Sequence, residues 1–204
     1  MRRLALILIA LTTGTLFAQP EIENTWVGVL REKLAPHQAL ALRDHPASIM
    51  VYLTEARERI TGSEVLRKAG QVAFLNAARY AEENLSDQPM EAVVVELKSA
   101  KINSAPITLD PVKLDPQYHI VEFENDRVRV LRTILEPHIK SPMHEHPPYV
   151  VVYLTELHTT MQLADGRTVD NPRKPGEIAW RDQMKHQTEN IGSDTAVEIQ
   201  VELK

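Results

Sequence analysis

The sequence predicts an all-β fold in which two tandem jelly-roll barrels follow a signal peptide. Many short segments alternate between apolar and polar residues, or are rich in β-branched residues, as half-buried and buried strands are. Turn signals such as Asp165-Gly166 separate these segments. The two halves of the chain also repeat each other. Short strands with frequent turns are typical of barrels and jelly rolls, and the repeat indicates two of them.

The expected strands lie in both halves of the chain. A short helix is expected at residues 63–69. The expected strands are residues 27–30, 49–53 and 92–97 in the first half, and 128–134, 149–154, 157–163 and 196–203 in the second.

The internal repeat keeps a constant spacing over long stretches. The run Tyr52-Leu53-Thr54-Glu55 recurs at 153–156, an offset of 101 residues (153 − 52). Gly70 recurs as Gly176, an offset of 106 (176 − 70). The five additional residues (106 − 101) must lie between these blocks, where the turn at 165–166 tolerates a change in length.

The repeat and the composition divide the chain into four segments. Residues 1–18 are the predicted signal peptide, and residues 21–98 form the first half of the duplication. Residues 99–117 form a linker that contains three prolines, at 106, 111 and 116. Residues 118–204 form the second half. We expect the linker to wrap one half onto the other.

The first segment has the features of a secretory signal peptide. Arg2 and Arg3 precede an apolar run at residues 4–17, and Ala18 is the expected cleavage residue. The run is short for a membrane span, so no stable membrane insertion is expected after cleavage. An uncleaved N-terminal anchor is the alternative. The sequence thus predicts a periplasmic or secreted protein, and its lack of cysteine means that packing alone stabilises it.

The charge balance argues against nucleic acid as a partner. The net charge is −5 and the isoelectric point is near 5.9, without a basic patch in the sequence. A small-molecule ligand or substrate is the expected partner. Association of two chains into a homodimer through exposed strand edges is compatible with the sequence.

The most informative motif is His144-Glu145-His146, which opens a long apolar segment. Residues i and i+2 of a strand point to the same face, whereas on a helix they point in nearly opposite directions. Pro142 and Pro147 disfavour a helix at this place. Two imidazoles on one face of a strand are half of a metal site.

The motifs of the second half resemble those of the cupin superfamily, which are small jelly-roll barrels with a central metal. The pair His144 and His146, followed by Pro147, is similar to the first cupin motif. Residues 175–176, His186 and Asn190 are similar to the second, and the run 186–192 is similar to small single-barrel cupins of the type associated with β-alanine degradation. This resemblance implies a metal held by His144, His146 and His186.

Two departures from the cupin pattern affect the expected site. Val150 stands where the first motif usually has a glutamate ligand, and His138 replaces the motif's leading glycine. The first half departs further, since the repeat places Arg43, His45 and Tyr80 at the three ligand positions. We therefore expect the first half to be a degenerate barrel without metal, which serves as the built-in partner of the second.

The ligand set leaves the metal and the reaction open. Three neutral imidazoles suit Fe, Zn, Mn, Ni or Cu as a divalent transition metal. Positions open to substrate are typical of catalytic sites. The resemblance implies dioxygenase-like chemistry, a zinc-hydroxide hydrolase is chemically feasible, and a non-catalytic small-ligand or metal-binding module is the alternative. The sequence indicates no catalytic acid or base on the ligand strands.

Several polar and aromatic residues near the motifs are weaker candidates. Gln183 is a candidate fourth ligand or substrate contact, and Tyr149 and Trp180 are candidate pocket walls. Glu145 is expected to be a surface acid and Asn190 to hold a turn. The other histidines are expected to be structural, namely His45, His119, His138 and His158.

Overall fold

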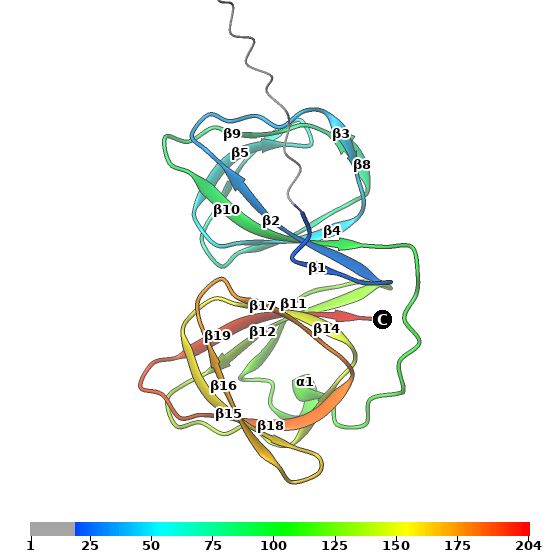
Figure 1. Cartoon of the computed structure of the whole chain (residues 1–204), viewed down its shortest axis with the longest axis vertical. Coiled ribbons are helices and arrows are strands. Elements are labelled where there is room, and N and C mark those ends of the chain that lie inside the picture. Colours follow the sequence, from blue (N-terminus) through cyan, green and yellow to red (C-terminus); the bar gives the residue numbers. More distant parts are fainter. Residues whose placement is uncertain (1–18) are drawn as a thin grey trace, which may run out of the picture.

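The computed structural model describes residues 19–204, so the predicted signal peptide lies outside the described residues. Strands dominate the described chain, which confirms the predicted all-β class. Figure 1 shows two rounded bodies stacked along the long axis. We call residues 22–97 the first half and residues 119–203 the second half. Between residues 19 and 204, no helix is long and apolar enough to cross a bilayer.

The first half is built from three antiparallel sheets. A five-stranded sheet has the order β1-β2-β10-β4-β7, and smaller sheets have the orders β3-β8 and β6-β5-β9. The strands are β1 (Ile22–Glu23), β2 (Val27–Leu34), β3 (Arg43–His45), β4 (Ser48–Tyr52), β5 (Ala56–Ile60), β6 (Ser63–Arg67), β7 (Val72–Leu75), β8 (Ala78–Tyr80), β9 (Glu82–Asn84) and β10 (Met90–Leu97).

The second half has the same order of strands in its five-stranded sheet, and its remaining strands form one sheet instead of two. A five-stranded sheet has the order β11-β12-β19-β14-β17, and a four-stranded sheet has the order β13-β18-β15-β16. The elements are the short helix α1 (Pro111–Leu114), then β11 (His119–Glu124), β12 (Val128–Leu135), β13 (His144–His146), β14 (Tyr149–Tyr153), β15 (Leu157–Leu163), β16 (Thr168–Arg173), β17 (Ile178–Arg181), β18 (Met184–Asn190) and β19 (Ala196–Leu203).

Strand pairing in the two halves follows the offsets of the sequence repeat. His144 on β13 pairs with His186 on β18, and Arg43 on β3 pairs with Tyr80 on β8. These pairs are related by the two offsets of the repeat (144 − 43 = 101 and 186 − 80 = 106). The additional residues of the second half lie in the β15–β16 hairpin, which is longer than the β5–β6 hairpin.

The prediction of a helix at residues 63–69 is wrong, because this segment contains strand β6. Ile60 and Ser63 pair across a two-residue turn. Both turn residues, Thr61 and Gly62, have positive φ, at 50° and 80°. A turn of this kind matches the right-handed twist of the two strands that it joins. Pairing with β5 therefore outweighs the local preference of residues 63–67 for a helix.

The two five-stranded sheets face each other through one shared apolar core. Alternate residues of β4 point to opposite faces, so Ile49 and Val51 enter this core while Met50 and Tyr52 fill the interior of the first half. Strand β14 does the same from the other side. The sheets are therefore buried on both faces, and their central strands read as continuous apolar runs.

Repeat-related polar contacts close the edge of this shared core. The Arg31 guanidinium donates to the Gly176 carbonyl at 2.6 Å, and the Arg132 guanidinium donates to the Gly70 carbonyl at 2.5 Å. Each glycine has a φ near 80°, so its carbonyl is presented by a turn that favours glycine. The two halves thus meet with approximate two-fold symmetry.

The linker is fixed to the second half rather than free of it. Figure 1 shows the chain running from β10 down the side of the molecule to α1. The Glu145 carboxylate, expected to be a surface acid, accepts hydrogen bonds from the backbone N–H groups of Thr108 and Leu109 at 2.7 and 3.2 Å. Asp110 accepts from Val112 and caps the first turn of α1.

Asn84 and Asn190 hold equivalent turns in the two halves. Asn190 is 1% exposed, and its amide donates to the carbonyls of Leu135 and Asp194 at 2.9 and 2.8 Å. Its side-chain oxygen accepts from the Gly192 N–H at 3.0 Å. Asn84 likewise donates to three backbone carbonyls. The turn role expected for Asn190 therefore agrees with its contacts.

We predict that Asn190→Ala and Asn84→Ala each lower the free energy of unfolding by about 2–3 kcal/mol, because buried backbone groups lose their partners. Both variants should shift the same single transition, since the apolar core is shared by the two halves. Urea denaturation followed by circular dichroism measures this. Asn76→Ala, at an exposed position, is the control. Two separate transitions, or a change of under 0.5 kcal/mol, would contradict this account.

Candidate metal centre

The two sheets of the second half enclose a small polar cavity. Its free space admits a water-sized sphere over about 30 Å³. Strands of both sheets line it, so its shape depends on how the sheets pack together. The polar and charged lining residues are His119, Thr133, Ser141, His144, Tyr149, Tyr153, Thr159, Asn171, Arg181, His186, Thr188, Glu198 and Gln200.

Strand pairing brings the three predicted ligands together. His144 and His146 lie on the same side of β13, and His186 lies opposite His144 on β18. All three are buried. The His144 ring centroid is 4.8 Å from that of His146 and 4.6 Å from that of His186, and the His146 and His186 centroids are 5.3 Å apart.

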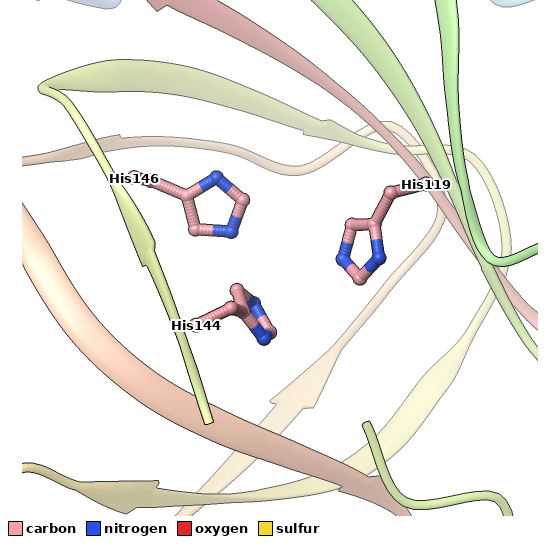
Figure 2. A group of neighbouring side chains, drawn as sticks. All are labelled: His119, His144 and His146. Atoms are coloured by element: carbon pink, nitrogen blue, oxygen red, sulfur yellow. The ribbon is translucent and has the colours of Figure 1, made fainter. Parts of the chain in front are cut away.

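A fourth histidine, His119, joins this group. It begins β11, directly after the linker, and its ring centroid is 4.9 Å from that of His144. One ring nitrogen from each of His119, His144 and His146 lies within 4.8 Å of the others, and Figure 2 shows the three rings converging. The sequence predicts a structural role for His119, because this residue lies outside both motifs. Only the packing of β11 beside β12 reveals it.

Hydrogen bonds orient these rings. Nδ1 of His144 contacts the Pro142 carbonyl at 2.8 Å, and Nδ1 of His119 contacts the Asp115 carbonyl at 3.4 Å. Within residues 19–204, Nε2 of His146 and Nδ1 of His186 are buried and have no hydrogen-bond partner. A buried polar nitrogen without a partner is costly, so the donor set fits a metal ion that would accept these lone pairs.

Burial keeps the four imidazoles neutral at neutral pH. It lowers the pKa of His119 to about 3, and it lowers the pKa of His144 as well. The pKa values of His146 and His186 lie well below the ordinary value, because of burial and then of repulsion between the rings. Neutral imidazole is the form that binds metals.

A chain of buried charges positions His146. The His146 Nδ1 lies 2.6 Å from an oxygen of Glu202, whose other oxygen accepts from Arg129 Nε at 2.6 Å. Arg129 also donates to both carboxylate oxygens of Asp110, at 3.0 and 3.1 Å. Burial raises the pKa of Glu202, and Arg129 acts against this rise. The carboxylate occupies Nδ1 and so directs Nε2 of His146 toward the other rings.

The three weaker candidates have different positions. Tyr149 lines the cavity, with its ring centroid 5.0 Å from that of His146. Gln183 does not line it; its amide exchanges hydrogen bonds with the Ala105 backbone at 2.9 and 3.0 Å. Trp180 stacks on Trp26 of the first half, at 5.7 Å between centroids. Alternation along β17 turns Trp180 toward the first half and Arg181 into the cavity.

An acid that sequence analysis missed also lines the cavity. Glu198 on β19 is partly exposed to this space, and burial raises the pKa of its carboxyl to about 7 despite the nearby Arg181. A carboxyl group with such a pKa can hold or release a proton near neutral pH. Its strand lies outside both histidine motifs, so only the closure of the sheets places it here.

The first half has a different interior. His45 stacks on Tyr80 at 3.8 Å between centroids, and its ring nitrogen contacts the Tyr80 carbonyl at 3.2 Å. Arg43 occupies the position of His144. Among the described residues, the histidine group of the second half is the only cluster with a metal-ligand arrangement.

Three glutamates fill the first half where the second half has threonines. Glu32, Glu58 and Glu82 correspond through the repeat to residues 133, 159 and 188, which line the cavity of the second half. Glu58 and Glu82 are 0% and 1% exposed. Burial and then the charge of Glu32 raise the pKa of Glu82 to about 11, and the Tyr52 hydroxyl donates to Glu58.

Comparisons with known proteins establish the fold. No family model matches the sequence, and no curated protein matches it. The structure resembles AerE from Microcystis aeruginosa, at 14% identity and a TM-score of 0.64, over 92% of this chain and 97% of that chain. It resembles a cupin 2 conserved barrel domain protein from Leptotrichia buccalis, at 9% identity and a TM-score of 0.61, over 92% and 88% of the two chains.

An enzyme is also among the similar structures. Salicylate 1,2-dioxygenase from Pseudaminobacter salicylatoxidans matches at 10% identity and a TM-score of 0.58, over 87% of this chain and 71% of that chain. At such identities the likeness shows the fold alone. The chain therefore has the fold of cupin proteins, as its motifs indicated.

We predict that Glu202→Gln weakens metal binding by about 10- to 100-fold, because His146 loses the carboxylate that orients it. Competition with a chromophoric zinc chelator measures the affinity. Glu96→Gln is the matched control, since Glu96 is the repeat equivalent of Glu202 in the half without the histidine cluster. Equal affinities for the two variants would contradict the positioning role.

We predict that Glu82→Gln stabilises the protein increasingly as the pH rises. The folded-state pKa of Glu82 lies near 11 and its unfolded value near 4.5, so ionisation destabilises the fold progressively above about pH 4.5. One additional proton in the folded state corresponds to about 1.4 kcal/mol per pH unit. Urea denaturation at pH 5, 7 and 9 should show a smaller pH slope for the variant. Glu64→Gln, at an exposed position, should keep the slope of the wild type.

Proposed function

We propose that the second half binds one divalent transition metal through His144, His146 and His186, with His119 as an additional ligand. We further propose that the protein is an exported, metal-dependent enzyme of the oxygenase type, which acts on a small polar or anionic molecule. The observation that carries this proposal is the convergence of four buried, neutral imidazoles, two of which have ring nitrogens without a partner.

The chemistry of the ligand set supports an open, reactive site. A bound ion would supply Lewis acidity and, if it is Fe or Cu, electron transfer to oxygen. The four imidazoles carry no charge, so the site would keep the full charge of a divalent ion and attract anions. Imidazole ligands suit Fe, Zn, Mn, Ni or Cu alike.

The residues of the chain would orient the ligands and control protons. Glu202 and the Pro142 carbonyl fix the rings of His146 and His144. Glu198 is the group on the cavity wall whose pKa near 7 suits it to hold or move a proton. The similar structures include salicylate 1,2-dioxygenase with adducts of gentisate, which supports small-molecule chemistry on this fold.

Export is part of the proposal and depends on residues 1–18. The basic Arg2 and Arg3, the apolar run and Ala18 support a signal peptide. The chain has no cysteine, so its fold does not depend on disulfide formation in an oxidising compartment.

A non-catalytic binding module is the second candidate. The narrow cavity favours it, because the centre of a water-sized sphere can move through only about 30 Å³ of this space. In such a module the histidines would hold a metal, or a metal and a small anion, without turnover.

We predict that the purified protein retains about one equivalent of a transition metal per chain, and that His144→Ala with His186→Ala abolishes this retention. Elemental mass spectrometry on protein from its native compartment measures the metal. His158→Ala is the control, because His158 is exposed and pairs with Glu156 away from the cluster. Absence of metal from the wild type, also after anaerobic loading with Fe²⁺, would overturn the proposed metal site.

Oxygen consumption then separates the two candidates. The Fe²⁺-loaded wild type should consume oxygen with a small acid or thiol, and the double variant should not. A protein that retains metal but consumes no oxygen with any of these compounds would favour the binding module.

A further inference from the structure

Arg181 is the one lysine or arginine that lines the cavity in the described chain. It lies at the end of β17, and its guanidinium makes only long hydrogen bonds, to the Tyr153 hydroxyl at 3.5 Å and to the Asn171 side-chain oxygen at 3.3 Å. Arg129, which is also half-buried, instead pairs with Asp110 and Glu202. Arg181 forms no ion pair within residues 19–204, so its hydrogen-bonding capacity is not used up by the fold.

Comparison of the two halves distinguishes the residues that the fold requires from those that only the cavity of the second half requires. The equivalent of Arg181 in the first half is Leu75 (181 − 106), which also ends a strand of the five-stranded sheet. Likewise Ala92 stands in place of Glu198 (198 − 106). The same scaffold therefore folds with apolar residues at these positions. The guanidinium belongs to the half with the histidine cluster, which indicates a role toward a ligand.

We propose that Arg181 binds the carboxylate of a small organic acid that occupies the cavity beside the histidines. A guanidinium presents a planar fork of N–H donors that matches a carboxylate, and a partly desolvated site strengthens this pairing. The apolar walls, which include Val151, Leu157 and Met161, would contact the carbon atoms of the acid. This proposal rests on the proposed function in one respect only, namely that the end of the acid away from Arg181 would lie at the metal.

The narrow cavity limits the size of the acid. The centre of a water-sized sphere can move through about 30 Å³ of it, so the smallest organic acids are the first ligands to consider. Acetate and propionate are suitable probes. Acetamide has nearly the same shape as acetate but carries no charge, so it tests the requirement for a carboxylate.

Glu198 would compete with such a ligand. It lines the same cavity as Arg181, and the two side chains influence each other electrostatically without forming an ion pair. When Glu198 is ionised, its negative charge repels the carboxylate of the ligand. Replacing it with glutamine removes this charge and preserves the shape. The proposal therefore demands opposite effects from Arg181→Leu and Glu198→Gln.

Titration calorimetry and saturation-transfer NMR with acetate and propionate test the proposal on the full chain, both stripped with EDTA and loaded with Zn²⁺. Arg181→Leu copies the residue of the first half and should weaken binding by about ten- to a hundredfold, with Arg181→Lys intermediate. Glu198→Gln should strengthen binding. Arg173→Leu is the matched control, since Arg173 also donates to Asn171 but does not line the cavity, and it should change affinity by less than about twofold.

The possible results decide the matter. Weaker binding by Arg181→Leu, together with no binding of acetamide, supports the proposal. Equal binding by Arg181→Leu and the wild type, equal binding of acetamide and acetate, or no binding of either acid to the wild type would overturn it. Loss of the proposed metal site leaves this result intact, because the EDTA-stripped protein is measured separately. A protein that binds metal but ignores Arg181 would overturn this inference alone.

Discussion

The apolar contact between the two five-stranded sheets is the constraint on which the rest of the structure depends. Each sheet has a second apolar face that fills the interior of its own half, so β4 and β14 are buried on both sides. If either sheet exposed to water the apolar face that it turns toward the other half, the free energy of the folded state would rise considerably. The duplication solves this problem within one chain, because each half covers the apolar face of the other.

The histidine cluster of the second half is built on this support. The sheet that faces the first half also carries Glu202, Glu198 and Arg181 on its inner side, and the opposite sheet carries His144, His146 and His186. The linker completes the site from outside, through Asp110, which holds Arg129 and thereby Glu202. Covalent connection of the halves thus also positions a histidine of the cluster.

The first half shows what the same scaffold does without these demands. It keeps the strand order, the turn asparagine and the glycine turn. In its interior, tyrosine stands in place of the histidine of β18, leucine in place of the arginine of β17, and glutamates in place of the threonines. Burial keeps the carboxyl of Glu82 protonated at neutral pH, as its raised pKa indicates. The interior of this fold therefore varies while the contact between the halves is preserved.

The sequence by itself determined the all-β class, the duplication and its register, and the meeting of His144, His146 and His186. Strand periodicity and repeat spacing are local or one-dimensional properties, so they can be read from residue order. Only the tertiary structure decided that 63–67 is a strand, that Trp180 faces the first half, and that Gln183 holds the linker. It also brought His119, Glu202, Glu198 and Arg181 to the site. None of these residues is a position of either motif. They become neighbours only because the sheets close over each other, which depends on packing across the whole half.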